Sequence, residues 1–308
     1  MASGETLSFE ERVVIVTGAG SGLGREYARQ LASRGARVVA NGRSKGNIAE
    51  TVEMIRNTGG DALGCVVDVT EIDAGERIVG AALEQWGRLD ALVNNAGVGH
   101  GGTLGDFSQE EFDAELAVSL GASIRLSHAA WPHLCGAGSG RIVNTSSSTI
   151  FGTPRSIPYT SAKAAVVGMT RGLAIDGIEA GIRVNAVMPL AYTPMNASLP
   201  NEEVTRQFHD HFPVQEAAAL ILLLAHERAP TTGETFVTGG GFTARVALVM
   251  GSGLVQEGAS PEGLLERFDD VMSLLEGWAP EASHSVRMHI IERQHAHSPQ
   301  PSDEGRAR

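Results

Sequence analysis

The stretch that decides the fold is VVIVTGAGSGLG, residues 13–24. Its first four residues are β-branched, too few for a helix and followed directly by glycines, so they predict a buried parallel strand. A helix is predicted next, over residues 25–34. Between them, Gly18 permits a tight turn, Gly22 lets the backbone approach a pyrophosphate, and Gly24 lets the helix pack closely on the strand. A flexible linker is also rich in glycine, but it lacks the flanking strand and helix, so the stretch predicts a dinucleotide-binding unit.

The end of the next strand bears on the choice of dinucleotide. Residues 37–40 predict this strand, and Asn41-Gly42-Arg43 follows it without a carboxylate. In dinucleotide folds an acidic residue here binds the ribose 2′-hydroxyl of NAD, whereas an arginine suits the 2′-phosphate of NADP. Arg43 therefore favours NADP(H), with NAD(H) as the alternative if Arg43 is only a solvated loop residue.

Strands and helices continue to alternate along the chain. Further strands are predicted at residues 62–69, 89–93, 141–144, 181–187 and 232–240, and helices at 46–57, 72–86, 112–132 and 159–178. This rhythm predicts an α/β protein with a doubly wound parallel sheet, a Rossmann fold, in a single domain over residues 8–245.

Beyond that domain, residues 246–293 are expected to form a helical C-terminal extension that packs on the core. Residues 294–308 are polar and are expected to form a disordered tail. The extension carries an apolar stripe at helical spacing, which more often covers a core or a subunit face than binds a cofactor; it comprises Leu264, Leu265, Phe268, Val271, Met272 and Leu275.

Composition excludes several classes of function. With 308 residues, 42% of them hydrophobic, the chain can bury a substantial core, and a formal net charge of −12 argues against nucleic acid as the main partner. Cys65 and Cys135 match no metal-ligand spacing, and neither does the histidine group His284, His289, His295 and His297. The first residues lack a signal-peptide pattern and no apolar run approaches the ~20 residues that span a bilayer, so a cytoplasmic protein without a membrane partner is expected.

Tyr159 and Lys163 are the first candidates for chemistry. On a helix, four positions place both side chains on one face. A cation held nearby favours the phenolate and lowers the pKa of a tyrosine from its ordinary value near 10, which makes the hydroxyl a usable proton donor and acceptor. Such a pair taken alone is usually a surface coincidence, so its context decides.

That context is a set of motifs in a fixed order: the glycine turn, Asn94-Asn95-Ala96-Gly97 after the fourth strand, the serine cluster 145–148 after the fifth, and then the Tyr159 helix. In this combination the sequence resembles the short-chain dehydrogenase/reductase family over about residues 8–243. The resemblance implies an NAD(P)(H)-dependent oxidoreductase acting on a small carbonyl or secondary-alcohol substrate, and assembly as a homodimer or homotetramer through the long helices 112–134 and 162–178.

The resemblance also implies the roles of the catalytic residues. Tyr159 would donate the proton to the carbonyl oxygen, and Lys163 would bind the nicotinamide ribose and lower the tyrosine pKa. A serine would orient the substrate oxygen. Counting forward from Asn144 selects Ser147, whereas counting back from Tyr159 selects Ser146. Ser147 is preferred because strands fix position while loops absorb a deletion.

Cofactor contacts follow from the same resemblance. The Asp68 carboxylate could meet the adenine amino group, and Asn95 could bridge strands, bind ribose, or do both. Thr193 matches a residue beside the nicotinamide. The full set of expected contacts is Gly18, Gly20, Ser21, Gly22, Leu23, Gly24, Arg43, Asp68, Val69, Asn95, Ala96, Gly97, Tyr159, Lys163, Pro189 and Thr193.

Three departures from the family pattern stand out. Ser119 occupies the place of an asparagine that belongs to a proton relay, Leu190 follows Pro189 where glycine is usual, and the NAD-type acid is absent. Ser119 and Leu190 keep a second reading open: a dinucleotide-binding protein with a sensing or assembly role and little catalysis.

A narrower likeness suggests a substrate. Residues 129–133 and 233–246 resemble the 3-hydroxyacyl-CoA dehydrogenase part of peroxisomal multifunctional enzymes, so a 3-oxoacyl or 3-hydroxyacyl thioester is the first expectation. Residues 191–213 occupy the position of the substrate lid in this family, and their composition names no substrate.

Overall fold

One sheet organises residues up to Val246 in the computed structural model, which describes residues 6–99, 101–197, 201–256 and 258–297. Its eight strands lie in the order β3-β2-β1-β4-β5-β6-β7-β8, and all neighbours are parallel except β7 and β8. The predicted doubly wound α/β fold is confirmed. The strands are β1 Val13–Val16, β2 Arg37–Gly42, β3 Asp61–Val66, β4 Ala91–Asn94, β5 Arg141–Thr145, β6 Arg183–Pro189, β7 Thr235–Gly239 and β8 Phe242–Val246.

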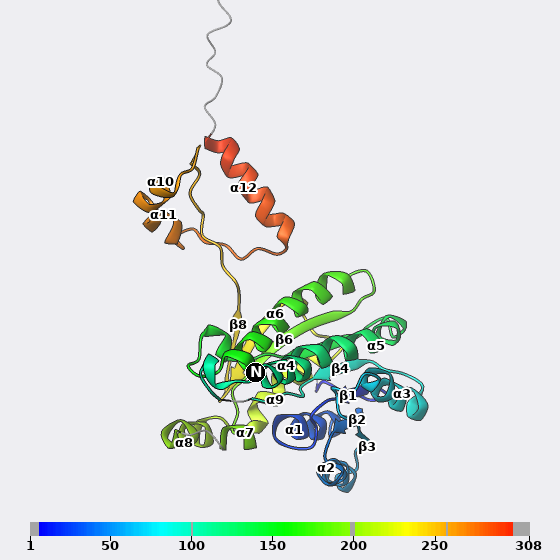
Figure 1. Cartoon of the computed structure of the whole chain (residues 1–308). Helices are drawn as coiled ribbons and strands as arrows, with labels where there is room; N and C mark the ends of the chain where they lie inside the picture. Colours follow the sequence, from blue (N-terminus) through cyan, green and yellow to red (C-terminus); the bar gives the residue numbers. More distant parts are fainter. Residues whose placement is uncertain (1–5, 100, 198–200, 257, 298–308) are drawn as a thin grey trace, which may run out of the picture. The chain divides into compact units, whose positions relative to one another are not determined.

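Helices cover both faces of the sheet (Figure 1). Strand β1 contributes to both cores, because its side chains alternate: Val14 and Val16 pack on one face, Val13 and Ile15 on the other. The first face carries α1 Gly22–Ala32, α2 Lys45–Asn57 and α9 Val214–Ala225, and the second carries α3 Ala74–Trp86, α5 Ala122–Gly136 and α6 Ile157–Gly177. Shorter segments are η1 Leu104–Asp106, α4 Gln109–Leu116, η3 Ser148–Phe151, α7 Pro194–Ala197 and α8 Glu202–His211.

The order of the strands defines where a ligand can bind. After β3 the chain returns to the middle of the sheet and adds β4 on the other side of β1. In open parallel sheets, ligands bind outside the carboxyl ends of the strands at this switch point. The glycine turn follows β1 there, and Asn94 at the end of β4 lies in register with Asn144 of β5.

The helix predicted over residues 112–132 is interrupted. Helix α4 passes through a π-helical turn, Ala117–Gly121, before α5 begins. A π-turn changes which residues share a helix face, and such turns are frequent at functional sites. The apolar pattern does not reveal it, because small residues on both sides fit either kind of turn.

The last predicted strand, 232–240, is in fact followed by another. Strand β7 ends at Gly239 and turns back as β8, and Gly240 and Gly241 take positive φ angles of 57° and 74°, which tight hairpin turns favour. The sequence analysis missed β8 because it is an edge strand: Phe242 is 60% exposed, and its burial pattern is not that of a core strand.

Some boundaries also differ. Helix α1 begins at Gly22, three residues before the predicted start, because the N–H of Arg25 already donates to the carbonyl of Ser21 at 3.2 Å. Strand β3 ends at Val66, so Asp68 and Val69 lie in the following turn rather than in the strand.

Residues from Ala247 onward form a second unit. It contains α10 Pro261–Glu266, α11 Phe268–Met272 and α12 Ser283–His297. The predicted apolar stripe is exposed in the single chain, with Leu265 at 76% and Leu275 at 81%; its packing on the core stays a prediction. Helix α12 extends to His297, into the region predicted as a tail from residue 294; residues 298–308 lie outside the described part, so the disordered tail stays a prediction. None of the described helices has the length and apolar character needed to cross a membrane.

Candidate active site

The turn between β1 and α1 has the shape of a phosphate cradle. Gly22 has a φ of 52°, a conformation that L side chains rarely adopt, at the start of α1. A Cβ atom on Gly24 would lie 2.2 Å from the carbonyl oxygen of Gly18, so only glycine lets α1 pack this closely. The first turn of α1 has no side-chain cap and no acidic residue, which leaves its N–H groups and positive dipole end suited to an anion.

Two residues that the sequence analysis missed hold this turn in shape. The Thr51 hydroxyl on α2 donates to the carbonyl of Ala19 at 2.9 Å. The Arg25 guanidinium donates to the carbonyl of Gly20 at 2.6 Å and to Glu50 at 2.7 Å. The carbonyl oxygens of the turn are therefore occupied on the side of α2. Arg25 stands directly after the last glycine, but nothing local to the sequence shows that Thr51 reaches the turn.

The residues expected around the adenosine lie together at the ends of β2 and β3. Arg43 is 68% exposed, and one guanidinium nitrogen is 3.8 Å from a carboxylate oxygen of Asp68. Burial alone would raise the pKa of Asp68, but hydrogen bonds from Thr70 and the charge of Arg43 hold it below its ordinary value. An exposed guanidinium with one distant partner remains available for a 2′-phosphate. Asn41 instead lies inside the sheet, where its amide donates to the carbonyls of Cys65 and Val67.

Asn95 has a structural role at the switch point. Its side-chain amide donates to the carbonyl of Thr17 at 2.9 Å, while the Thr17 hydroxyl accepts from the backbone N–H groups of Asn95 and Ala96. These bonds tie the end of β4 to the glycine turn. Of the two roles expected for Asn95, the strand-bridging one is confirmed.

Lys163 is buried beside this junction. It is 2% exposed, its ammonium donates to the carbonyl of Thr145 at 2.9 Å, and it lies 5.5 Å from the centre of the Tyr159 ring. A Cβ atom on Gly97 would come within 3.3 Å of the ammonium. Burial lowers the pKa of Lys163 to about 8, while the charge of Glu115 raises it. The spacing of four thus brings Lys163 to Tyr159, as the sequence predicts.

The net pKa shift of Tyr159 runs opposite to the lowering expected from Lys163. Burial raises the pKa of Tyr159, the Ser147 hydroxyl lowers it, and the negative charge of Glu115 raises it further. The net direction is upward, because the cost of burying the charged phenolate exceeds the stabilisation that the hydrogen bond from Ser147 gives it. At neutral pH Tyr159 is therefore a protonated hydroxyl, the form that a proton donor requires.

The two candidate serines have different surroundings. Ser147 acts on the Tyr159 hydroxyl, and its oxygen also accepts from the N–H of Thr149 at 3.2 Å. Ser146 is 1% exposed, and its hydroxyl donates to the backbone carbonyl of Lys163 at 2.8 Å. Ser146 thus anchors α6 to the end of β5, whereas Ser147 faces the Tyr159 hydroxyl.

A buried acid lies close by, and the sequence analysis did not select it. Glu115 on α4 is completely buried and lies one helical turn before Ser119, whose buried hydroxyl has no hydrogen-bond partner among the described residues. The sequence did contain a sign of this burial. Glu115 shares a helix face with Phe112 and Ser119, so a charged residue occupies the face that packs inward.

The segment after β6 lies close to the glycine turn and to Gly99, which lies beside Tyr159. A Cβ atom on Gly22 would touch the Thr193 side chain at 3.4 Å, and one on Gly99 would meet the Met195 sulfur at 3.5 Å and the Tyr159 ring at 3.8 Å. The start of this segment therefore spans from the glycine turn to the tyrosine. Leu190, which replaces the usual glycine, has its Cβ 2.8 Å from the position of a Cβ on Gly239, so its side chain starts toward β7.

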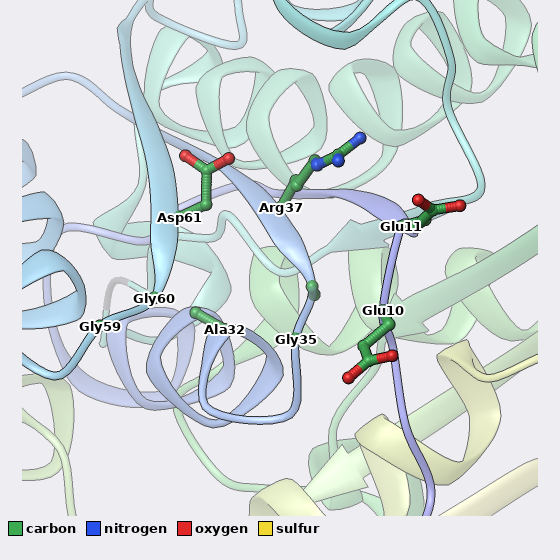
Figure 2. Close-up of a pocket in the computed structure, with 9 residues that line it drawn as sticks. Glu10, Glu11, Ala32, Gly35, Arg37, Gly59, Gly60 and Asp61 are labelled. Atoms are coloured by element: carbon green, nitrogen blue, oxygen red, sulfur yellow. The ribbon is translucent and has the colours of Figure 1, made fainter.

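A shallow pocket of about 290 Å³ lies elsewhere, at the amino ends of β2 and β3. Figure 2 shows the charged residues around it: Glu10 and Glu11 on the segment before β1, Arg37 on β2 and Asp61 on β3. This is the edge of the sheet opposite to Tyr159. Three carboxylates around one guanidinium also make a poor site for a phosphorylated cofactor, so the pocket is no alternative active site.

Comparisons with known proteins agree with this geometry. A family model described as short chain dehydrogenase matches residues 12–204. The chain is 32% identical to peroxisomal multifunctional enzyme A of Dictyostelium discoideum, over 87% of this chain and 61% of that protein, so it spans about three-fifths of that relative. It is 38% identical to the (2S)-[(R)-hydroxy(phenyl)methyl]succinyl-CoA dehydrogenase subunit BbsD of Thauera aromatica, over 64% of this chain and 80% of that protein.

A solved structure gives the same result. The crystal structure of a short chain dehydrogenase from Mycobacterium avium superposes with a TM-score of 0.76 at 32% identity, over 85% of this chain and 95% of that chain. The matched residues 12–204 include the glycine turn, the serine cluster, Tyr159 and Lys163. The chain therefore belongs to the short-chain dehydrogenase/reductase family of NAD(H)- or NADP(H)-dependent oxidoreductases.

Proposed function

We propose that this protein interconverts a carbonyl and a secondary alcohol with NADP(H), and that its substrate is a 3-oxoacyl or 3-hydroxyacyl thioester. The observation that carries the proposal is the meeting of Tyr159, Lys163 and Ser147 at the carboxyl edge of the sheet, beside a glycine turn suited to a pyrophosphate. Each group has a chemical task in such a reaction, and the alternative of a non-catalytic binding protein gives no task to a buried lysine beside a tyrosine.

In this mechanism the bound dinucleotide supplies or accepts the hydride. The glycine turn holds its pyrophosphate, and Lys163 holds the nicotinamide ribose. Ser147 orients the substrate oxygen, and the protonated Tyr159 gives its proton to that oxygen as the carbonyl is reduced. In the opposite direction Tyr159 takes the proton from the alcohol. The residues after β6, including Thr193 and Met195, lie close enough to the glycine turn and to Tyr159 to limit access of water.

The substrate class is supported by the relatives. The subunit from Thauera aromatica is named for a hydroxyl-bearing CoA thioester, and the multifunctional enzyme from Dictyostelium is 32% identical to this chain over 87% of its residues. Self-association is part of the proposal: Ile124 on α5, Ile175 on α6 and Ile178 just beyond it are 48%, 51% and 64% exposed in the single chain, which suits pairing of these helices.

The test is a spectrophotometric screen of nicotinamide absorbance. NADPH and NADH are supplied with 3-oxoacyl-CoA thioesters of different chain length and with ketones that lack a thioester. We expect consumption of NADPH with the thioesters. Turnover of ketones alone would refute the substrate class. Tight binding of NADPH without turnover of any carbonyl would favour the sensing or assembly role over the enzyme.

Ser147→Ala and Ser146→Ala separate the two candidate serines. We expect Ser147→Ala to lower kcat by about 100-fold with little change in melting temperature, because it removes a group that orients the reacting oxygen. Ser146→Ala should instead lower stability by about 1 kcal/mol through the lost bond to the backbone of α6, with a smaller change in kcat. Steady-state kinetics and thermal melting of both variants distinguish the two roles. A large loss of kcat in Ser146→Ala with a loss of stability in Ser147→Ala would assign the catalytic role to Ser146.

Arg43→Ala tests the preference for NADP(H). Since a guanidinium binds a phosphate through charge-assisted hydrogen bonds, we expect the Kd of NADPH to rise by about 30-fold, equivalent to about 2 kcal/mol, with little change for NADH. Arg34→Ala, an exposed arginine just beyond the end of α1, is the matched control. Binding is followed by nicotinamide fluorescence. Equal losses for both dinucleotides would show that Arg43 does not read the 2′-phosphate.

A further inference from the structure

Glu115 is the least expected side chain near the active site. It is the one residue of α4 that is buried, and it is completely so, although moving an ionised carboxylate from water into a protein interior is strongly unfavourable. Lys163, equally deep in the protein, presents the same difficulty with the opposite sign. Helix α4 packs against α6, the helix that carries Lys163 (Figure 1). Two buried opposite charges on contacting helices offset each other's desolvation.

The surroundings leave Glu115 as the source of negative charge for this pair. Exposed acids of α4, such as Glu110 and Asp113, face solvent. The neighbouring groups named by the structure are neutral: the carbonyl of Thr145 from β5 accepts from Lys163, the Ser147 hydroxyl contacts Tyr159, and buried Ser119 lies in the π-helical turn that packs on α6. Among the charged groups of the described residues, Glu115 is the one whose charge acts on both Tyr159 and Lys163.

We propose that Glu115 is a positioning residue of this active site, whose buried negative charge holds Lys163 as an ammonium beneath Tyr159. The expected effect on turnover rests on the proposed oxidoreductase function, whereas the electrostatic effect of Glu115 on Lys163 does not. This role of Glu115 also gives a reason for Ser119. Ser119 places a small hydroxyl where the family pattern has the neutral amide of an asparagine. In this chain the negative charge of Glu115, one turn earlier, then stabilises Lys163.

The consequence for Lys163 is a matter of protonation. With a pKa of about 8, Lys163 is mostly an ammonium at pH 7, and the carboxylate of Glu115 offsets part of the effect of burial. Without Glu115 the midpoint falls, and a larger fraction of the protein carries a neutral amine that binds the ribose hydroxyls less well. The pKa of Tyr159 falls as well, because the same negative charge opposes the phenolate. Both changes move the pH dependence of turnover in the acidic direction.

The chain offers a direct measurement, because it contains only two lysines, Lys45 and Lys163. NMR of protein labelled with ¹³C-lysine therefore gives two side-chain titrations, with the exposed Lys45 as the internal reference. We expect Glu115→Gln to move the Lys163 midpoint to lower pH, Glu115→Asp to place it between wild type and the glutamine variant, and Glu110→Gln on the exposed side of α4 to leave it unchanged. At pH 7, kcat of Glu115→Gln should fall roughly tenfold, with the basic limb of the profile moved to lower pH.

Each outcome of this titration either supports or overturns the proposed role of Glu115. An unchanged Lys163 midpoint in Glu115→Gln, or an equal shift in Glu110→Gln, overturns the proposal. If Glu115→Gln does not fold, the aspartate variant carries the test, and a midpoint identical to wild type then sinks it. Because the titration needs neither cofactor nor turnover, a shifted midpoint in a protein that reduces no carbonyl would uphold the electrostatic role and reject the proposed function.

Discussion

Replacing Tyr159 with phenylalanine is expected to lower kcat by about 1000-fold while the Kd of NADPH stays nearly unchanged. The substitution removes a single oxygen from the ring. In the proposed mechanism that oxygen exchanges a proton with a substrate oxygen next to Ser147, and burial raises its pKa, so that it is protonated at neutral pH. The ring, its contact with the Lys163 ammonium and the packing of α6 all remain. Stopped-flow measurement of a single turnover separates this loss from slow product release.

Tyr27→Phe is the matched control for this variant. Tyr27 is completely buried in α1, and its hydroxyl has no hydrogen-bond partner among the described residues, so burial raises its pKa and keeps it neutral. Removing this oxygen should leave kcat unchanged and alter stability by less than about 1 kcal/mol. Turnover that survives in Tyr159→Phe would refute the catalytic assignment, whereas an equal loss in Tyr27→Phe would point to a general effect of the substitution.

The parts of the site that the sequence predicts are those set by local pattern. The glycine turn is read from β-branched residues followed by glycines, and the spacing of Tyr159 and Lys163 fixes their common helix face. Both patterns depend on backbone geometry within a few residues, which the chain specifies by itself. The parallel arrangement of the strands follows from the alternation of helices and strands, because parallel neighbours require crossover connections.

The parts that the sequence does not predict depend on packing between distant segments. The direction of the Tyr159 pKa shift is set by burial, which no spacing reveals, and it reverses the expectation from Lys163 alone. The burial of Glu115 follows from the contact of α4 with α6. The apolar spacing near the π-helical turn and near β8 is too weak to reveal either feature. It therefore predicts one uninterrupted helix over residues 112–132 and makes the strand at 232–240 the last one.

Gly24→Ala is expected to destabilise the protein by about 3 kcal/mol and to weaken NADPH binding by more than about 100-fold. Taken alone, alanine is a better helix former than glycine by about 1 kcal/mol, so helix propensity predicts stabilisation. The geometry reverses the sign. The new Cβ atom would lie 2.2 Å from the carbonyl oxygen of Gly18 and 2.5 Å from the side-chain nitrogen of Asn95. Both are held by the turn and the strand behind it, so α1 must move away and the cradle opens.

Gly80→Ala makes the same substitution where there is room. Gly80 lies within α3, and a Cβ atom there has no neighbouring atom within 4 Å, so this variant should be stabilised by about 0.5–1 kcal/mol with unchanged binding. Urea denaturation and fluorescence titration with NADPH on both variants therefore give opposite signs for one chemical change. If Gly24→Ala unfolds at the same urea concentration as wild type and binds NADPH equally well, the close approach of α1 to the end of β1 is not what shapes the phosphate cradle.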